Sequence, residues 1–246
     1  MSHTDVIFAP VFLPLLGAAL AFCGKAFFKN RKAKIVEYSA AFIGLGLPWL
    51  VLLYLLPFIL SGETIQLNIG NWAGGIGIMF RFDGLAWLVN LLGYSVATAA
   101  WVYSLGAGPR GPGFTALFLI QISALAATAM TVDLFNLFVC LEVMGIASYV
   151  LVASSEKSGA FLASFSYLMV SATAMIFFLV GLFGLYRLTG TLSYDGIASS
   201  LKMLPDEGGI TALLSLSLIV AAVAMRVAVM PLYGWLPDAH AMAPHA

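Results

Sequence analysis

Two residues of opposite charge, Glu142 and Arg226, lie inside long apolar stretches of this sequence. Glu142 stands near the middle of residues 134–154, and Arg226 stands near the end of residues 210–230. An ionised carboxylate in a membrane helix is costly, so such residues usually face the interior of a helix bundle or a wet cavity. Burial favours the neutral acid, whereas a nearby cation favours the carboxylate. A carboxyl held between these two effects can load and release a proton.

Each of the two residues also has a purely structural interpretation. For Glu142 the alternative is a neutral acid that only joins two helices through a hydrogen bond. For Arg226 it is a side chain that snorkels from a helix end to the membrane surface. Gly145 and Tyr149 follow Glu142 by three and seven residues, which places a close-approach position and a hydroxyl on its helix face. Arginine keeps its proton at ordinary pH, so Arg226 can bias a neighbouring carboxyl but cannot relay a proton.

The segment that follows Arg226 is the most distinctive part of the sequence. Pro231 lacks an amide donor and is expected to break or kink the helix, and broken helices in membranes are buried in protein or line a cavity. His240 titrates near neutrality, and Asp238 is close enough along the chain to influence it. The alternative is an interfacial loop that ends the helix, with Trp235 at the membrane surface.

Composition assigns the protein to the membrane class. Of 246 residues, 62% are hydrophobic and 9% are charged, and the mean hydropathy is +1.02. Soluble domains carry about 25% charged residues, so a soluble enzyme is excluded. The formal net charge of zero argues against nucleic acid as a partner. Cys23 and Cys140 lie in apolar runs and are interpreted as packing thiols. No ligand spacing predicts a metal site, and no glycine-rich loop predicts a nucleotide or other cofactor site.

The hydropathy pattern predicts an all-α integral membrane protein with about seven transmembrane helices. A spanning helix needs about 20 mainly apolar residues. Such stretches occupy residues 6–27, 38–60, 85–106, 114–132, 134–154, 161–188 and 210–230. Only Asp133 separates the fourth stretch from the fifth.

The loops between these stretches carry an orientation signal. Five of the eleven Lys and Arg residues (Lys25, Lys29, Arg31, Lys32 and Lys34) fall between the first and second stretches. Arg110 and Lys157 fall in two further loops of the same side, which gives seven basic residues against three on the other side. The positive-inside rule then predicts a multi-pass protein of the inner (plasma) membrane with its amino terminus outside.

Three connecting segments have patterns of their own. Residues 62–82 alternate polar and apolar on both sides of a glycine-rich break, which predicts a small external β-hairpin. Residues 106–113 are a glycine- and proline-rich breaker, and residues 193–204 suit a short interfacial helix. The chain therefore divides into residues 1–110, with three helices and the hairpin, and residues 111–246, with helices four to seven.

The carboxyl-terminal segment resembles a known family. Residues 226–246 are similar to the seventh helix and following loop of the antiporter-like subunits of respiratory complex I, Mrp-type cation/proton antiporters and group 4 membrane-bound hydrogenases. In that family a basic residue precedes a Pro-Leu-aromatic-x-Trp-Leu-Pro-Asp-Ala pattern, which residues 231–239 match. Residues 141–144 look like the fifth-helix glutamate of the family, and the hairpin with residues 82–85 is also similar.

The resemblance implies a proton or sodium/proton translocating subunit of a redox-driven complex, of the NADH:quinone oxidoreductase or hydrogenase type, or of an Mrp antiporter. It places redox cofactors in other subunits and none in this chain. It implies a proton pathway through Glu142, Arg226 and His240, supported by Tyr149, Pro231, Tyr233 and Asp238. Expected partners are the lipid bilayer and other membrane subunits, including one that supplies a second antiporter repeat.

Three departures from the family pattern stand out. Arg226 replaces the usual lysine, and Tyr233 stands where a histidine is common. The family also runs to about fourteen helices with a second inverted repeat, whereas this chain carries the first half. A natural split subunit, a frameshift product and a fragment all stay open as explanations.

Two other functions fit the same hydropathy. The first is a structural membrane subunit that scaffolds its partners and conducts no ions, which the arginine and the single repeat favour. The second is a free-standing transporter of a small organic solute, which would work in vesicles without any partner.

Overall fold

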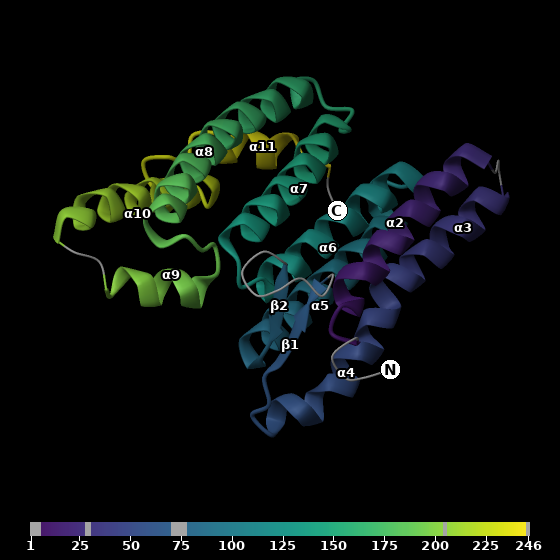
Figure 1. The fold of residues 1–246 in the computed structure, drawn as a ribbon. Coiled ribbons are helices and arrows are strands. Elements are labelled where there is room, and N and C mark those ends of the chain that lie inside the picture. Colours follow the sequence, from purple (N-terminus) through teal and green to yellow (C-terminus); the bar gives the residue numbers. More distant parts are fainter. Residues whose placement is uncertain (1–5, 28–30, 70–77, 204–205, 245–246) are drawn as a thin grey trace.

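The computed structural model describes residues 6–27, 31–69, 78–203 and 206–244, and these residues are mostly helical. Figure 1 shows α2 (Ala9–Phe27) and α3 (Arg31–Ala41) on one side of the molecule. On the other side lie α8 (Ala160–Thr189), α10 (Asp206–Arg226) and the short α11 (Leu236–Met242). Between these two groups lie α5 (Gly84–Ala107), α6 (Pro112–Met130) and α7 (Leu134–Ala153).

Six helical segments in the described part of the chain are long and apolar enough to cross a membrane. They are Arg31–Leu60, Gly84–Gly106, Pro112–Met130, Leu134–Ala153, Ala160–Thr189 and Gly208–Arg226. The first expected span, residues 6–27, coincides largely with α2, but the apolar part of α2 (Ala9–Gly24) falls short of the 18 residues required. The described residues thus contain six candidate spans, and the count of seven stays a prediction.

The basic segment before the second span is partly helical, which differs from the loop expected there. Arg31, Lys32 and Lys34 lie on α3, so this helix begins at Arg31 rather than at residue 38. Lys29 falls outside the described residues. The segment from α3 continues through a short π-helix (Phe42–Gly46) into α4 (Leu47–Leu60). Lysine and arginine are good helix formers, so a short basic run does not by itself end a helix.

Asp133 separates α6 from α7, as the sequence predicts. Its carboxylate accepts a hydrogen bond from the amide of Asn136 at 2.8 Å, which is the geometry of a helix N-cap. The Asn136 side chain in turn donates to the hydroxyl of Thr131 at 2.8 Å. Two helices with only residues 131–133 between them therefore form distinct segments.

The predicted hairpin and the predicted short helix are both present. β1 (Ile65–Asn68) pairs antiparallel with β2 (Met79–Phe82), and Ile65 lies opposite Phe82. The segment that joins the strands, residues 70–77, lies outside the described residues. In the second region α9 (Tyr194–Leu201) begins after Ser193, whose hydroxyl caps it. The external and interfacial positions of these two elements stay predictions.

Buried hydrogen bonds fix α2 against the helices that pack on it. Pro14 has no amide hydrogen, so the carbonyl of Pro10 has no partner within α2. The hydroxyl of Tyr94 on α5 donates to that carbonyl, and the hydroxyl of Ser123 on α6 donates to the carbonyl of Val11 at 2.7 Å. These contacts lie in a core cluster that spans α2 to α6.

A second, smaller core cluster joins α8 and α10, with side chains of α7 packed against it. Phe178 of α8 and Ala222 of α10 are at its centre. This cluster holds α7, α8 and α10 together around the two charges singled out in the sequence.

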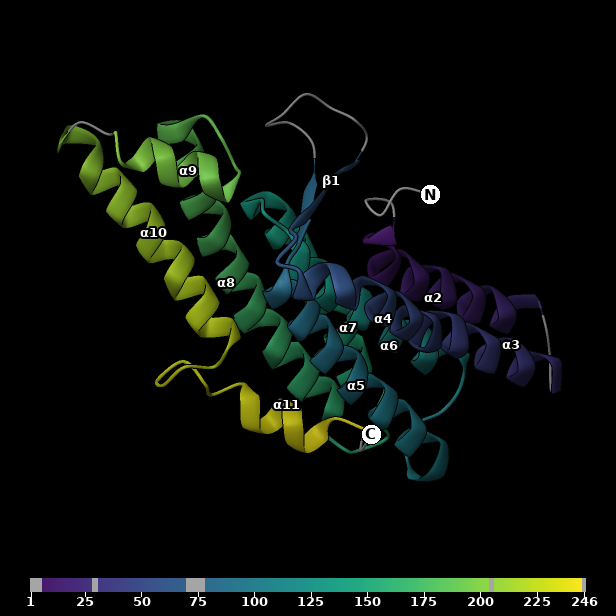
Figure 2. The ribbon, with the colours of Figure 1, turned by 90° about the horizontal axis from the view of Figure 1, so that it is seen from below.

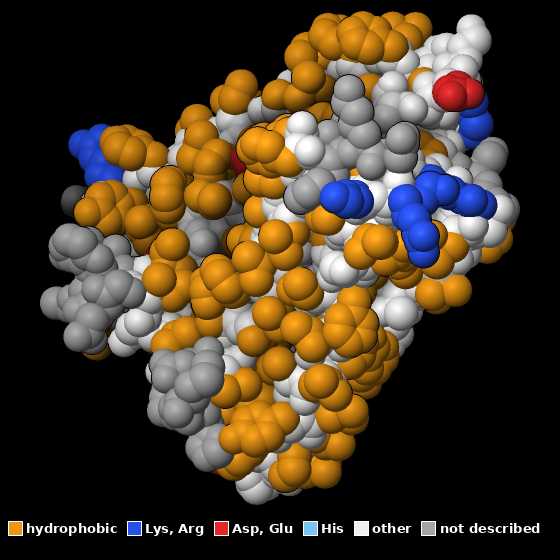
Figure 3. Space-filling model, turned by 90° about the vertical axis from the view of Figure 1, so that its right-hand side faces the viewer, with side chains coloured by type: hydrophobic (Ala, Val, Ile, Leu, Met, Phe, Trp, Pro, Cys, Tyr) orange, Lys and Arg blue, Asp and Glu red, His pale blue; other side chains and the backbone are white. Residues whose placement is uncertain are grey.

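The outer surface is largely hydrophobic, as expected of side chains that contact lipid. Leu85, Val96, Ile176 and Leu213 are among many large apolar residues with more than half of their surface exposed. Figure 3 shows one such face, on which hydrophobic side chains predominate and most of the visible Lys and Arg side chains gather toward one end.

Candidate functional site: an ion pair between α7 and α10

The structure brings Glu142 and Arg226 together. A terminal nitrogen of Arg226 lies 3.2 Å from a carboxylate oxygen of Glu142, close enough for a charge-assisted hydrogen bond. The second terminal nitrogen donates to the carbonyl of Leu141 at 2.7 Å. The Arg226 side chain is only 9% exposed and that of Glu142 is 32% exposed. Arg226 thus points toward α7 and is not a surface side chain.

Gly145 makes room for this approach. A β-carbon at this position would lie 2.7 Å from a terminal nitrogen of Arg226 and 2.6 Å from the hydroxyl of Tyr149. Both distances are too short for a real contact, so only glycine leaves the two groups where they are. The guanidinium and the phenol therefore both lie over the Gly145 backbone, one helical turn from Glu142.

Replacing Gly145 by alanine should displace the arginine more than it harms the fold. The atoms that the new methyl group would meet are the ends of flexible side chains, so they can move away while the helices stay packed. We expect folded protein in which the Glu142–Arg226 pair is disturbed. If the pair serves transport, the rate should fall by up to about 100-fold, the scale for a misplaced reacting group.

Gly106→Ala is the matched control, because a β-carbon at Gly106 meets nothing within 4 Å. Thermal unfolding, and proton uptake by vesicles that contain the assembled complex, would be measured for both variants. Wild-type uptake by the Gly145 variant would show that the position of the guanidinium does not matter.

α10 ends directly at Arg226, five residues before the proline expected to break it. Ala228 adopts a left-handed conformation with φ of 55°, and its amide donates to the carbonyl of Met225 at 3.3 Å. The amide of Val229 donates to the carbonyl of Ala224 at 3.0 Å. This is the Schellman arrangement, which ends a helix by pairing its last carbonyls. The break therefore precedes Pro231, and residues 227–235 connect α10 to α11 without forming a helix.

An aromatic stack anchors the connector between α10 and α11. The indole of Trp235 donates to the carbonyl of Met225 at 3.0 Å and stacks on Tyr167 of α8, with ring centres 4.1 Å apart. Tyr167 meets Tyr149 edge to face at 4.7 Å. Trp235 is only 8% exposed, so its ring is covered by protein. Tyr167 carried no signal in the sequence, because one aromatic residue in an apolar helix is ordinary.

The other residues expected to support a pathway lie apart from the ion pair. Pro231 and Tyr233 are exposed on the connector, and Asp238 and His240 are exposed on α11. Among the described residues, no hydrogen bond or ion pair joins His240 to Asp238 or to Glu142. Residues two apart on a helix point in different directions, so the short spacing of Asp238 and His240 does not bring them together.

Lys157 holds the end of α11 in place. Its ammonium donates to the carbonyls of Ala241 and Ala243 at 2.8 and 3.0 Å, across the end of that short helix. A cation at a helix carboxyl terminus also interacts favourably with the helix dipole. In the sequence Lys157 counted only as one basic loop residue, because its partners are more than 80 positions away.

A second polar group lies at the opposite end of α7. Arg81 is 3.8 Å from Asp83 and 3.7 Å from Asp195, and these pairs are exposed enough to contribute little stability. Burial, and then the nearby charge of Asp133, raise the pKa of Tyr194 to about 12. Its hydroxyl therefore stays neutral near physiological pH.

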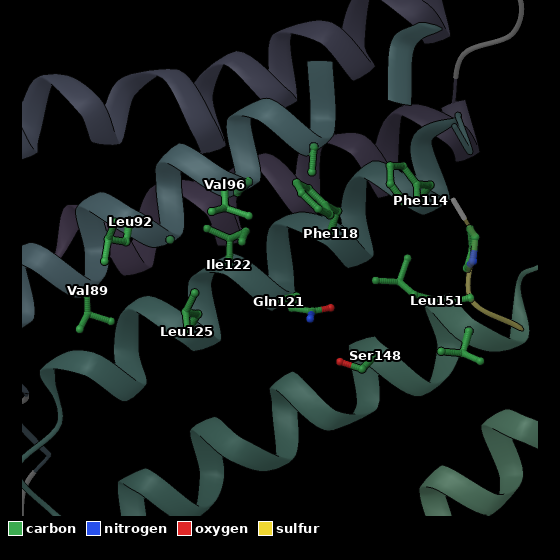
Figure 4. A pocket seen from close by; sticks show the side chains of 16 residues that line it. Val89, Leu92, Val96, Phe114, Phe118, Gln121, Ile122, Leu125, Ser148 and Leu151 are labelled. Carbon is green, nitrogen blue, oxygen red and sulfur yellow. The ribbon is translucent and has the colours of Figure 1, made fainter. Parts of the chain in front are cut away.

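A sizeable groove lies away from the ion pair. It has a volume of about 640 Å³ and lies between α5, α6 and α7 (Figure 4). Within the described part of the chain, no group of three or more His, Cys, Asp and Glu residues is arranged to hold a metal ion. The pair of Glu142 and Arg226 is thus the feature in the described helices best suited to proton chemistry.

This chain is similar in sequence and fold to subunits of known membrane complexes. Residues 131–246 match the family described as "NADH:quinone oxidoreductase/Mrp antiporter, TM". NADH-quinone oxidoreductase subunit N of Desulforudis audaxviator is 35% identical over 191 residues, which cover 76% of this chain and 38% of that protein. A putative antiporter subunit mnhD2 of Staphylococcus haemolyticus is 29% identical over 243 residues, which cover 98% of this chain and 47% of that protein.

Solved structures show the same fold over nearly the whole chain. The archaeal membrane-bound sulfane sulfur reductase, a respiratory membrane complex, contains a chain that is 28% identical, with a TM-score of 0.86. The alignment covers 97% of this chain and 48% of that one. The Mrp complex of Dietzia sp. DQ12-45-1b contains a chain with a TM-score of 0.82 at 24% identity, covering 99% of this chain and 44% of that one.

The chain spans less than half the length of each of these relatives. Residues 131–246, which match the family, include both charged residues of the ion pair and the segment that follows Arg226. The motifs of that segment agree with the fold and with the family match. The chain is therefore a membrane protein of the antiporter-like subunit family shared by NADH:quinone oxidoreductase and Mrp antiporter complexes.

Proposed function

We propose that this chain is a proton or sodium/proton translocating, antiporter-like subunit of a redox-driven membrane complex or an Mrp-type antiporter. The observation that carries the proposal is the ion pair between Glu142 and Arg226 at 3.2 Å, between two membrane helices and beside the end of α10. A permanent cation next to a titratable carboxyl favours the carboxylate, so its approach or withdrawal can control whether the carboxyl holds a proton.

In this proposal Glu142 is the proton acceptor and Arg226 sets its protonation. With the pair closed, the guanidinium favours the carboxylate. When Arg226 moves away, the carboxyl loses its counter-charge in an apolar setting and takes up a proton from water. The connector at residues 227–235 has few helical hydrogen bonds of its own, so it is the part of the chain best able to permit this movement.

The remaining members of the proposed pathway have different roles. Tyr149 offers a hydroxyl beside Arg226, and His240 offers an imidazole on α11. Pro231, Tyr233 and Asp238 shape the connector and the short helix that carries His240. A proton would pass between these groups through water, because no hydrogen bond among the described residues joins Tyr149, Asp238 and His240 to one another.

The orientation and the partners belong to the same proposal. The basic loops place the amino terminus and the hairpin outside the plasma membrane. Residues 111–246 form the first half of an antiporter-like repeat unit, with residues 1–110 packed beside it. Other membrane subunits supply the driving reaction and carry the redox centres.

The alternative is a non-conducting subunit that scaffolds such a complex. One observation favours it, namely that Arg226 cannot release its proton. As a scaffold, the chain would use the ion pair only to lock α7 to α10.

Purification of an affinity-tagged chain from the native membrane tests the proposal. Other membrane subunits should co-purify, and vesicles that contain the whole assembly should take up protons when the assembly is driven. The isolated chain should show no uptake. Uptake of a solute by the isolated chain would instead support a free-standing transporter and contradict the proposal.

A further inference from the structure

The 640 Å³ cavity between α5, α6 and α7 is an apolar groove of the size of a ligand site, for which about 300–1,000 Å³ is typical. Val96 and Leu92 of α5 face Ile122 and Leu125 of α6 across it, and Gln121 and Ser148 are polar exceptions (Figure 4). The ion pair takes no part in this groove, so the proposed proton pathway does not account for it.

The length of the groove indicates what can occupy it. Along α5 it runs from Val89 to Ala100, which is about 16 Å at the helical rise of 1.5 Å per residue. The hydrocarbon core of a bilayer is about 30 Å thick, so the groove corresponds to one leaflet. A partner helix would have to cross the whole core, whereas one acyl chain needs only half of it.

A charged pocket continues the groove at one end. It has a volume of about 530 Å³ and is lined by Arg110, Lys157 and Glu156, and Pro244 lines both spaces. All three charged residues lie in the loops that join α5 to α6 and α7 to α8. Figure 2 shows the end of α11 near the end of α5, at this edge of the bundle.

The two cations keep donors free for a ligand. Arg110 has five N–H groups and uses two nitrogens on the carbonyls of Ser104 and Gly106. Lys157 has three N–H groups and uses two on carbonyls at the end of α11. The carboxylate of Glu156 is exposed in the same pocket. The pocket thus offers two positive groups and one negative group at the mouth of an apolar groove.

We propose that this place binds a phospholipid with a primary ammonium head group, namely phosphatidylethanolamine. Its phosphate contacts Arg110 and Lys157, its ammonium faces Glu156, and one acyl chain lies in the groove between α5, α6 and α7. Basic pockets between membrane helices on the cytoplasmic side are known to bind lipid head groups. The carboxylate of Glu156 favours this lipid over phosphatidylglycerol, because phosphatidylglycerol has a phosphate but no ammonium group.

Native mass spectrometry of the purified full-length chain tests the site. Delipidated protein would be mixed with equal amounts of phosphatidylethanolamine and phosphatidylglycerol, and the retained lipid measured. Wild-type protein should retain mainly phosphatidylethanolamine. Arg110→Gln with Lys157→Gln should lower retention of both lipids by about ten-fold, because charge-assisted hydrogen bonds to the phosphate are lost. Glu156→Gln should remove the preference between the two lipids.

Two further variants keep the test decisive. Ala100→Phe fills the groove without touching the head-group residues, and it should lower retention of both lipids in folded protein. Arg187→Gln with Lys202→Gln removes the same charge at positions outside the pocket and should retain lipid as wild type does. Unchanged retention in the Ala100 variant, or an unchanged preference in the Glu156 variant, would overturn the proposal. The readout is lipid binding, so the result does not depend on the proposed transport function.

Discussion

Replacing Glu142 by glutamine should abolish proton transport by the assembled complex. Glutamine has nearly the same shape and can still accept a hydrogen bond from Arg226, so the packing of α7 against α10 should persist. It holds no titratable proton, however, so no proton can be loaded at this position. Uptake by vesicles that contain the assembled complex would be measured at a fixed driving force.

The matched control for this variant is Glu63→Gln. Glu63 is an exposed carboxylate beside the hairpin, so its loss removes one negative charge without touching the ion pair. Both variants should assemble with their partners to the same extent, which co-purification would check. If the Glu142 variant transports protons at the wild-type rate, the carboxyl is only a hydrogen-bonding group and the scaffold function stands.

Replacing Arg226 by alanine should impair transport, whereas lysine should be tolerated or should improve it. Alanine removes the cation that faces Glu142 and leaves the carbonyl of Leu141 without its arginine donor. The free energy of unfolding is expected to fall by about 1–3 kcal/mol. This value lies between those for exposed and for fully buried ion pairs, because Glu142 is partly exposed.

The lysine variant separates charge from geometry. Lysine keeps the positive charge and can also release a proton, but it cannot contact Glu142 and Leu141 with two fixed nitrogens. Proton uptake and thermal unfolding would be measured for both variants. Full transport by the alanine variant would mean that Arg226 contributes only packing at the end of α10.

Local chemical signals allowed much of the fold to be predicted. Asp133 was the only polar residue between two apolar stretches, and it does separate α6 from α7 as an N-cap. The alternation in residues 62–82 predicted the two strands, because one face of a paired strand is buried. The resemblance to the antiporter-like family, and not local chemistry, suggested that Glu142 and Arg226 act together, and they lie 3.2 Å apart.

Other features depend on contacts between distant parts of the chain. Ala228 ends α10 in a left-handed conformation that alanine rarely adopts, so Pro231 was the visible signal and the helix ends before it. Trp235 stacks on Tyr167, which lies far away in the sequence, so no local pattern indicates this contact. Arg31 begins a helix in a segment that reads as a basic loop, because charge alone does not disfavour a helix.

The account rests on the claim that Arg226 controls the protonation of Glu142. Infrared difference spectroscopy of the assembled complex at neutral pH measures this directly, with the protonated carboxyl of Glu142 identified by its loss in the Glu142→Gln variant. The carboxyl signal should be stronger in Arg226→Ala than in the wild type, and close to the wild type in Arg226→Lys. An equal signal in wild type and Arg226→Ala would contradict the account, because the cation would then have no influence on the proton.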